Sequence, residues 1–332
     1  SDGITSIGSY TFYGLYKIKG ELKIPNGVTS IGASAFWYCI GLTGELVIPD
    51  SVTSISQGAF SKCRGFTGNI IIPDKVTYIG QGAFSECTGF TGDLTIPNRV
   101  TYIGVDAFWG CTGLDGDVII PSSVSNIVAG PTFGTRVKNI FVDDSNKYYK
   151  DIDGVLFTKD GTKLVQYPSG REGSYSIPSG TEVIGQDAFR DSVISGKLDI
   201  PDTVTDIGYY SFSGCSELTG DLVIPDSVKS ISSSAFSRCS GFTGNLVIPD
   251  SVTSIGSRAF TGCSGITDIN VEKSEDEFTS MTNYPFGLTN KATVFHWNSS
   301  PGVACKIDIS VPEEVEFKVG GVEPLPLVKD VI

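Results

Sequence analysis

The sequence predicts a β-rich solenoid in which repeats of about 24 residues stack, each contributing one parallel strand. Two observations predict this fold class: cysteine, proline and phenylalanine each recur at a 24-residue step, and alternating apolar residues precede the prolines. The cysteines of the series are Cys39, Cys63, Cys87 and Cys111, followed by Cys215, Cys239 and Cys263. Prolines keep the step from Pro25 to Pro121 and from Pro201 to Pro249, and phenylalanines from Phe12 to Phe108 and from Phe212 to Phe260.

Residues 42–65, LTGELVIPDSVTSISQGAFSKCRG, form one complete repeat. Leu46 and Ile48 alternate with Glu45 and Val47, which is the two-residue period of a short strand with one buried face. Pro49 ends that strand because proline has no N–H group to donate.

The second half of the repeat predicts a short extended stretch and one helical turn on the convex side. Val52 and Ile55 point inward from the extended stretch. Ala59, Phe60 and Cys63 stand three and four residues apart, so one helical turn places them on the same face. A single repeat cannot bury this face alone, and neighbouring repeats must therefore stack at about 4.8 Å per strand.

This repeat resembles the BspA-like family of bacterial leucine-rich-repeat proteins, whose unit is similar to LxxIxIPxxVxxIGxxAFxxC. The resemblance covers about residues 4–271 and implies a leucine-rich-repeat solenoid on a secreted or surface protein that binds host matrix proteins or other bacteria. Most repeats here carry one extra residue before the strand. We expect a glycine to absorb it in a bulge or a positive-φ turn. The glycines concerned are Gly44, Gly68, Gly92, Gly116, Gly220 and Gly244.

The 24-residue step is interrupted between Phe133 and Phe189. Residues 155–158 and 163–167 predict a β-hairpin that turns at residues 159–161. We expect this insertion, at about residues 143–173, to replace the outer arc of one repeat. Strands at residues 139–142 and 175–177 should then continue the sheet on either side without a break.

We divide the chain into a solenoid over residues 1–271 and a capping segment over residues 272–332. The capping segment contains strand-like runs at 292–298 and 305–311, and the last coil of a solenoid needs a cover. At the other end, Ile4 and Ile7 match Val28 and Ile31, so we expect the chain to begin inside a repeat and the natural protein to extend further.

Composition disfavours several classes of partner. A net charge of −13 and an isoelectric point near 4.5 disfavour nucleic acid and anionic lipid. No apolar run reaches the ~20 residues that a membrane helix needs, so we expect no membrane insertion. Only 18% of residues are charged while small polar residues abound, which favours a secreted or cell-surface protein.

The eight cysteines predict neither a metal site nor disulfides. One cysteine per repeat forms a straight ladder, whereas zinc needs four ligands that converge tetrahedrally. Stacked side chains point the same way, so a disulfide between neighbours would have to twist them. Leu15 occupies the cysteine position in the first repeat, which indicates an apolar site, and we expect free thiols in the core.

No pattern typical of catalysis is present, so we expect a protein that is not an enzyme and needs no cofactor. The sequence contains no GxSxG, HExxH or P-loop motif. Its single histidine, His296, is expected to be a partly buried strand residue rather than a general base.

Two columns of exposed residues flank the buried Leu and Ile of each strand, and they predict a binding face. The first column is largely acidic and runs Glu21, Glu45, Asn69, Asp93, Asp117, Asn139, Ser174, Lys197, Asp221, Asn245, Asp268. The second is largely apolar and runs Lys23, Val47, Ile71, Thr95, Ile119, Phe141, Ser176, Asp199, Val223, Val247, Asn270. We expect a protein partner to bind there. The candidate residues are Val47, Ile71, Asp93, Asp117, Ile119, Phe141, Val223 and Val247.

Other interpretations of these columns stay open. Valine and isoleucine favour strands in any case, and aspartate keeps an edge soluble. Aligned carboxylates could hold calcium, but no EF-hand-like pattern is present. Carbohydrate binding is the second function, because Trp37 and Trp109 on the outward turns could stack on sugar rings or could simply fill gaps there. A structural spacer in a larger surface protein is the third.

Overall fold

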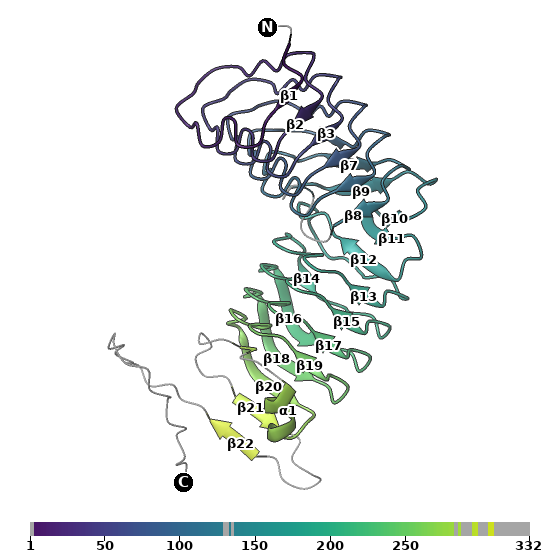
Figure 1. Ribbon diagram of the computed structural model, residues 1–332. Coiled ribbons are helices and arrows are strands. Elements are labelled where there is room, and N and C mark those ends of the chain that lie inside the picture. Colours follow the sequence, from purple (N-terminus) through teal and green to yellow (C-terminus); the bar gives the residue numbers. More distant parts are fainter. Residues whose placement is uncertain are drawn as a thin grey trace, which may run out of the picture.

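The computed structural model describes residues 3–128, 133, 136–281, 285–286, 294–297 and 305–308, which wind into a solenoid of stacked coils (Figure 1). Helix is nearly absent: within these residues the helix is α1, Glu275–Met281. All other elements are short strands, and most pair in parallel with the equivalent strand of the next repeat.

One ladder of the N-terminal half is built from the Val-x-x-Ile stretch of each repeat. Its strands are β1 Ser6–Ile7, β2 Ser30–Ile31, β3 Ser54–Ile55, β4 Tyr78–Ile79, β6 Tyr102–Ile103 and β8 Asn126–Ile127. They pair in this order with isoleucine opposite isoleucine, so a column of identical side chains fills the core.

A second ladder comes from the stretch that precedes each proline. Its strands are β5 Leu94–Thr95, β7 Asp117–Ile120 and β9 Asn139–Val142. In the earlier repeats the same stretch forms only isolated bridges, such as the one between Lys23 and Val47. In the N-terminal half, the predicted strand is thus regular only in β5, β7 and β9.

The inserted glycines explain part of this irregularity. Positive φ angles are found, as expected, at Gly44, Gly68, Gly92, Gly220 and Gly244. Gly116 has no positive φ, so the positive-φ alternative does not apply there. Glycine is favoured there for another reason, because a Cβ would lie 2.9 Å from the backbone nitrogen of Asp93 in the preceding repeat.

The outer turns are not helical, which corrects the helical turn expected there. Ala59, Phe60 and Cys63 are fully buried on one face, as predicted. However, Gly58 and Lys62 have φ angles of 60° and 65°, far from the negative φ of an α-helix. Backbone hydrogen bonds to the next repeat, including Phe60 N–H to Ala83 O at 2.8 Å, hold the turns in this shape.

The phenylalanines of successive turns stack into a column along the solenoid. Ring centroids lie 5.3 to 5.5 Å apart from Phe36 through Phe60 and Phe84 to Phe108. Each repeat therefore buries its aromatic ring against both neighbours, and no repeat has a complete core of its own.

Seven cysteines of the ladder are free and buried, as predicted. Each thiol donates a hydrogen bond of 2.9 to 3.0 Å to a phenylalanine carbonyl of the preceding repeat, as Cys87 does to Phe60. Burial raises the pKa of Cys111 and of Cys215 to about 12. The site is thus not simply apolar, since the thiol satisfies a backbone acceptor as well as filling space. The Cys305 side chain lies outside the described residues.

The insertion is a three-stranded meander made of β10 Tyr149–Ile152, β11 Val155–Thr158 and β12 Lys163–Gln166. The predicted hairpin is confirmed in β11 and β12, and β10 adds a strand that the sequence did not indicate. The pairing of β12 with β13, Val183–Ile184, makes the meander the start of the next ladder.

The expectation of an unbroken sheet across the insertion is wrong. The ladder β5-β7-β9 ends at β9, residues 175–177 form no strand, and the corresponding C-terminal ladder begins at β14, Gly196–Lys197. The meander itself takes the free edge of β9, where Ile140 N–H donates to Gly154 O at 2.8 Å. The buried residues likewise form two core clusters that meet at the meander.

The C-terminal half repeats the two-ladder plan. Beyond β13 one ladder contains β15 Asp206–Ile207, β17 Ser230–Ile231 and β19 Ser254–Ile255. Beyond β14 the other contains β16 Leu218–Val223, β18 Phe242–Ile248, β20 Ile266–Val271, β21 Val294–Trp297 and β22 Cys305–Asp308. The strands expected within 292–298 and 305–311 are confirmed by β21 and β22.

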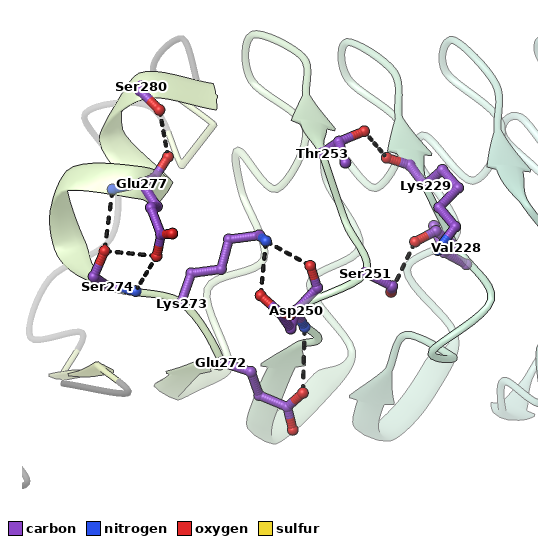
Figure 2. Close-up of polar contacts among 10 residues, drawn as sticks. All are labelled: Val228, Lys229, Asp250, Ser251, Thr253, Glu272, Lys273, Ser274, Glu277 and Ser280. Atoms are coloured by element: carbon purple, nitrogen blue, oxygen red, sulfur yellow. Dashed lines mark hydrogen bonds and ion pairs between the residues drawn. The ribbon is translucent and has the colours of Figure 1, made fainter. Parts of the chain in front are cut away.

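Helix α1 was not expected, although its start carries a sequence signal. Ser274 and Glu277 form a capping box: Ser274 N–H donates to the Glu277 carboxylate at 3.1 Å, and Glu277 N–H donates to Ser274 Oγ at 3.4 Å (Figure 2). The preceding Lys273 ties the chain back to Asp250 of the previous coil at 2.9 Å.

Candidate binding surface

The strand face carries a line of exposed apolar side chains. Val47 and Ile71 are 64% and 69% exposed, and Ile119 and Phe141 are 40% and 42% exposed. Thr95 pairs with Ile119, and Ile119 pairs with Phe141. Val47 and Ile71 are the equivalent residues of the two repeats before Thr95 and line one hollow together. We call the row Val47, Ile71, Thr95, Ile119 and Phe141 the apolar stripe.

Carboxylates lie beside the stripe at its N-terminal end. Glu45, Val47, Asp50 and Ile71 together line one shallow hollow, to which Asn69 also contributes. Glu45 and Val47 line the adjoining hollow as well, with Glu21 and Lys23. Val47 and Ile71 form the apolar floor of the first hollow. Glu45 precedes Val47 in the chain and Asp50 follows it, so this floor has an acidic residue on each side.

The aspartates of the predicted site have a structural role that the sequence did not indicate. The Asp93 carboxylate accepts a hydrogen bond of 2.8 Å from Asp117 N–H, and the Asp117 carboxylate accepts one of 2.8 Å from Asn139 Nδ2. Asp221 repeats the arrangement with Asn245 N–H at 3.0 Å. These side chains tie neighbouring repeats together, so they differ from Glu45, which has no such bond within the described residues.

The C-terminal continuation of the face is less open. Val223 is 48% exposed and pairs with Val247, but Val247 is half-buried. Beyond Val247, the Asp250 carboxylate forms an ion pair with Lys273. The backbone N–H of Asp250 donates to the Glu272 carboxylate at 3.3 Å (Figure 2). The structure therefore brings Val47, Ile71, Ile119 and Phe141 together in one row and leaves Val223 and Val247 beyond the insertion.

The tryptophans proposed for sugar stacking already have ring partners. Trp37 stacks on Tyr13 with centroids 4.6 Å apart, and Lys62 Nζ lies 5.3 Å from the Trp37 ring. The guanidinium of Arg190 lies 5.9 Å from the centroid of Trp109. Both indoles are half-buried, which favours the interpretation that they fill gaps on the outer turns.

Arg190 joins the repeats on either side of the insertion, which sequence reasoning missed. Besides Trp109 it lies 5.3 Å from the Tyr210 ring, and it pairs with the buried Asp187 at 3.0 Å. Burial, and secondly the negative charge of Asp187, raises the pKa of Asp106 in this cluster. Trp109 and Tyr210 come from repeats other than that of Arg190, so no local motif indicates these ring contacts.

The histidine and the side chains that could bind a metal are the remaining candidates for chemistry among the described residues. His296 is half-buried in β21, as predicted, with Nε2 3.2 Å from the Asp268 carboxylate. Within the same residues, no three His, Cys, Asp or Glu side chains are placed to share a metal ion. No helix in that part of the chain is long and apolar enough to cross a membrane.

The repeats match a known family over most of the chain. The family model for the BspA type leucine rich repeat region matches six copies, over residues 5–135 and 173–293. The chain belongs to the BspA-type leucine-rich-repeat family. The gap between the matched regions contains the three strands of the insertion. No curated protein is similar enough in sequence to serve as a relative.

Solved structures of similar proteins have the same fold. A leucine-rich cell surface protein from Faecalibacterium prausnitzii is 26% identical with a TM-score of 0.59, covering 86% of this chain and 87% of that one. The pneumococcal vaccine antigen PcpA is 22% identical with a TM-score of 0.60, covering 82% and 76%. A leucine-rich-repeat protein from Eubacterium ventriosum is 23% identical with a TM-score of 0.56, covering 83% and 80%.

Proposed function

We propose that this chain is a non-catalytic binding module of a secreted or cell-surface bacterial protein, and that it recognises a protein partner through the apolar stripe. The single observation that carries the proposal is the row of exposed apolar side chains Val47, Ile71, Ile119 and Phe141, which only Thr95 interrupts. Contiguous exposed apolar surface marks interaction sites in soluble proteins. Host matrix proteins are the first class of partner to test.

Within this proposal, Phe141 is the anchor of the site. It is the largest side chain of the stripe and lies at its end, on β9, where the meander begins. Buried aromatic residues often contribute most of the affinity of an interface. Val223 and Val247 continue the surface beyond the meander and would contribute less.

Two further observations support a binding module rather than an enzyme. The Asp93 and Asp117 carboxylates of the strand face accept hydrogen bonds from neighbouring repeats, so they have a structural role in joining the repeats. The similar structure from Faecalibacterium prausnitzii is described as a cell surface protein, and the pneumococcal one as a vaccine antigen. These descriptions also support the part of the proposal that places this chain in a secreted or cell-surface protein.

The test is a binding screen against an array of extracellular matrix proteins and an array of glycans. For a matrix protein that binds, Ile71→Ser and Phe141→Ala should each weaken affinity at least tenfold, with Phe141→Ala raising the dissociation rate. Tyr209→Ala, at an aromatic residue 53% exposed outside the stripe, is the matched control and should change nothing.

The competing location is the outer turns. Unchanged affinity in Phe141→Ala together with a large loss in Trp109→Ala would overturn the proposal. So would binding to glycans alone that is lost in Trp37→Ala, because that result would make the chain a carbohydrate-binding protein. Thermal melts of all variants must show that each remains folded at the assay temperature.

A further inference from the structure

We propose that the N-terminal part of the apolar stripe binds a basic amphipathic α-helix of its partner. This inference rests on the proposed function and adds the shape and charge of the segment that binds. It concerns the hollow lined by Glu45, Val47, Asp50 and Ile71, which we call the N-terminal hollow.

The charge of the N-terminal hollow selects a cationic partner. Glu45 and Asp50 are exposed and have no hydrogen bond or ion pair to other described residues, in contrast to Asp93 and Asp117. They lie on either side of the apolar floor made by Val47 and Ile71. A lysine or arginine can lay its aliphatic stem on such a floor while its charged end meets the carboxylate at the border.

The negative charge at the position of Asp50 is weaker in the next repeat. Asp74 is the residue equivalent to Asp50 in the next repeat and is also exposed, but Lys75 follows it directly. At the other end, Lys23 occupies the stripe position one repeat before Val47 and would repel a cation. The attraction is therefore concentrated at Glu45 and Asp50, and a bound segment extends from Val47 toward Ile119.

The spacing of the stripe fits a helix laid along the solenoid axis. From Val47 to Ile119 there are three repeat spacings of about 4.8 Å, about 14 Å in all, which corresponds to roughly ten residues of α-helix. A helix presents one residue per turn along a face, every ~5.4 Å, close to the repeat spacing. An extended strand presents same-face residues about 6.8 Å apart and fits less well. An amphipathic helix with basic residues on both borders of its apolar stripe matches the apolar row and both carboxylates.

Three synthetic peptides of about 14 residues test the inference directly. The first has leucines at helical spacing bordered by lysines, the second has the same leucines bordered by glutamates, and the third is the first with its residues scrambled. The first should bind, gain helical circular dichroism on binding, and lose affinity at least tenfold between 50 and 200 mM salt. The second should not bind, and the third should bind at least tenfold more weakly than the first.

Variants locate the contact. Glu45→Gln combined with Asp50→Asn should weaken binding of the lysine-bordered peptide at least tenfold. The matched control, Glu172→Gln combined with Asp276→Asn, removes the same charge at two exposed positions outside the stripe and should have little effect. Equal losses in the two pairs, equal binding of the scrambled peptide, or binding without gain of helix would each overturn the inference.

The outcome is separable from that of the proposed function. If Ile71→Ser abolishes binding of a matrix protein while the Glu45 and Asp50 pair and the salt concentration leave it unchanged, the stripe binds a partner of another kind and only this inference fails. If Ile71→Ser and Phe141→Ala leave matrix protein binding unchanged, the proposed function itself fails.

Discussion

Replacing Phe84 by alanine should destabilise the protein strongly and locally, although Phe84 is far from any proposed contact. Its ring is fully buried and stacks on Phe60 and Phe108 at 5.5 and 5.4 Å, with an edge contact to Phe90 at 6.4 Å. Truncation of a buried phenylalanine costs about 3–5 kcal/mol, and we expect the upper part of this range because both ring faces lose a partner.

Urea unfolding and hydrogen exchange measure the two parts of this prediction. The free energy of unfolding should fall by about 4–5 kcal/mol. Exchange should accelerate first in the repeats that contain Phe60 and Phe108, because each repeat contacts mainly its neighbours. Phe12→Ala is the control, since that ring is 37% exposed and stacks on Phe36 alone. A loss equal to that of the control, or exchange accelerated evenly from end to end, would refute the stacked-column reasoning.

The remaining predictions concern the thiols, the aspartates and the contact across the insertion. Thiol titration should find few reactive groups in the native protein and about eight after denaturation, and three or more disulfides by mass spectrometry would contradict the free ladder. Because burial raises the pKa of Cys111 and Cys215 from 9.0 to about 12, their contribution to stability is complete below pH 9 and is lost as pH rises toward 12, at ~1.4 kcal/mol per pH unit for each thiol. In Cys111→Ala the unfolding free energy should fall less steeply with pH between pH 9 and 12. An unchanged pH dependence would argue against a buried neutral thiol. Asp93→Ala should cost about 1 kcal/mol in a denaturant melt, because Asp117 N–H loses its acceptor, and a neutral result would mean that water replaces the carboxylate. Arg190→Ala should accelerate hydrogen exchange at the insertion more than elsewhere, and unchanged exchange there would show that the meander alone joins the two halves.

The sequence by itself determined the period, the parallel pairing of one strand per repeat, the buried Phe and Cys columns and the hairpin of the insertion. It could do so because each residue of a solenoid packs mainly against its equivalents one repeat away, so spatial contacts appear directly as a sequence period. The buried stack at Phe60 and the exposed row at Val47 and Ile71 both follow from that periodicity.

Only the tertiary structure decided the features for which the period carries no information. The positive φ of Lys62 depends on bonds between repeats rather than on local helix preference. The structural use of Asp93 depends on where the neighbouring repeat places an N–H group. The break in the ladder after β9, and the position of Arg190 between Trp109 and Tyr210, arise where the insertion interrupts the repeat. There the contacting residues are no longer equivalents, and neither spacing nor residue type indicates which side chains will meet.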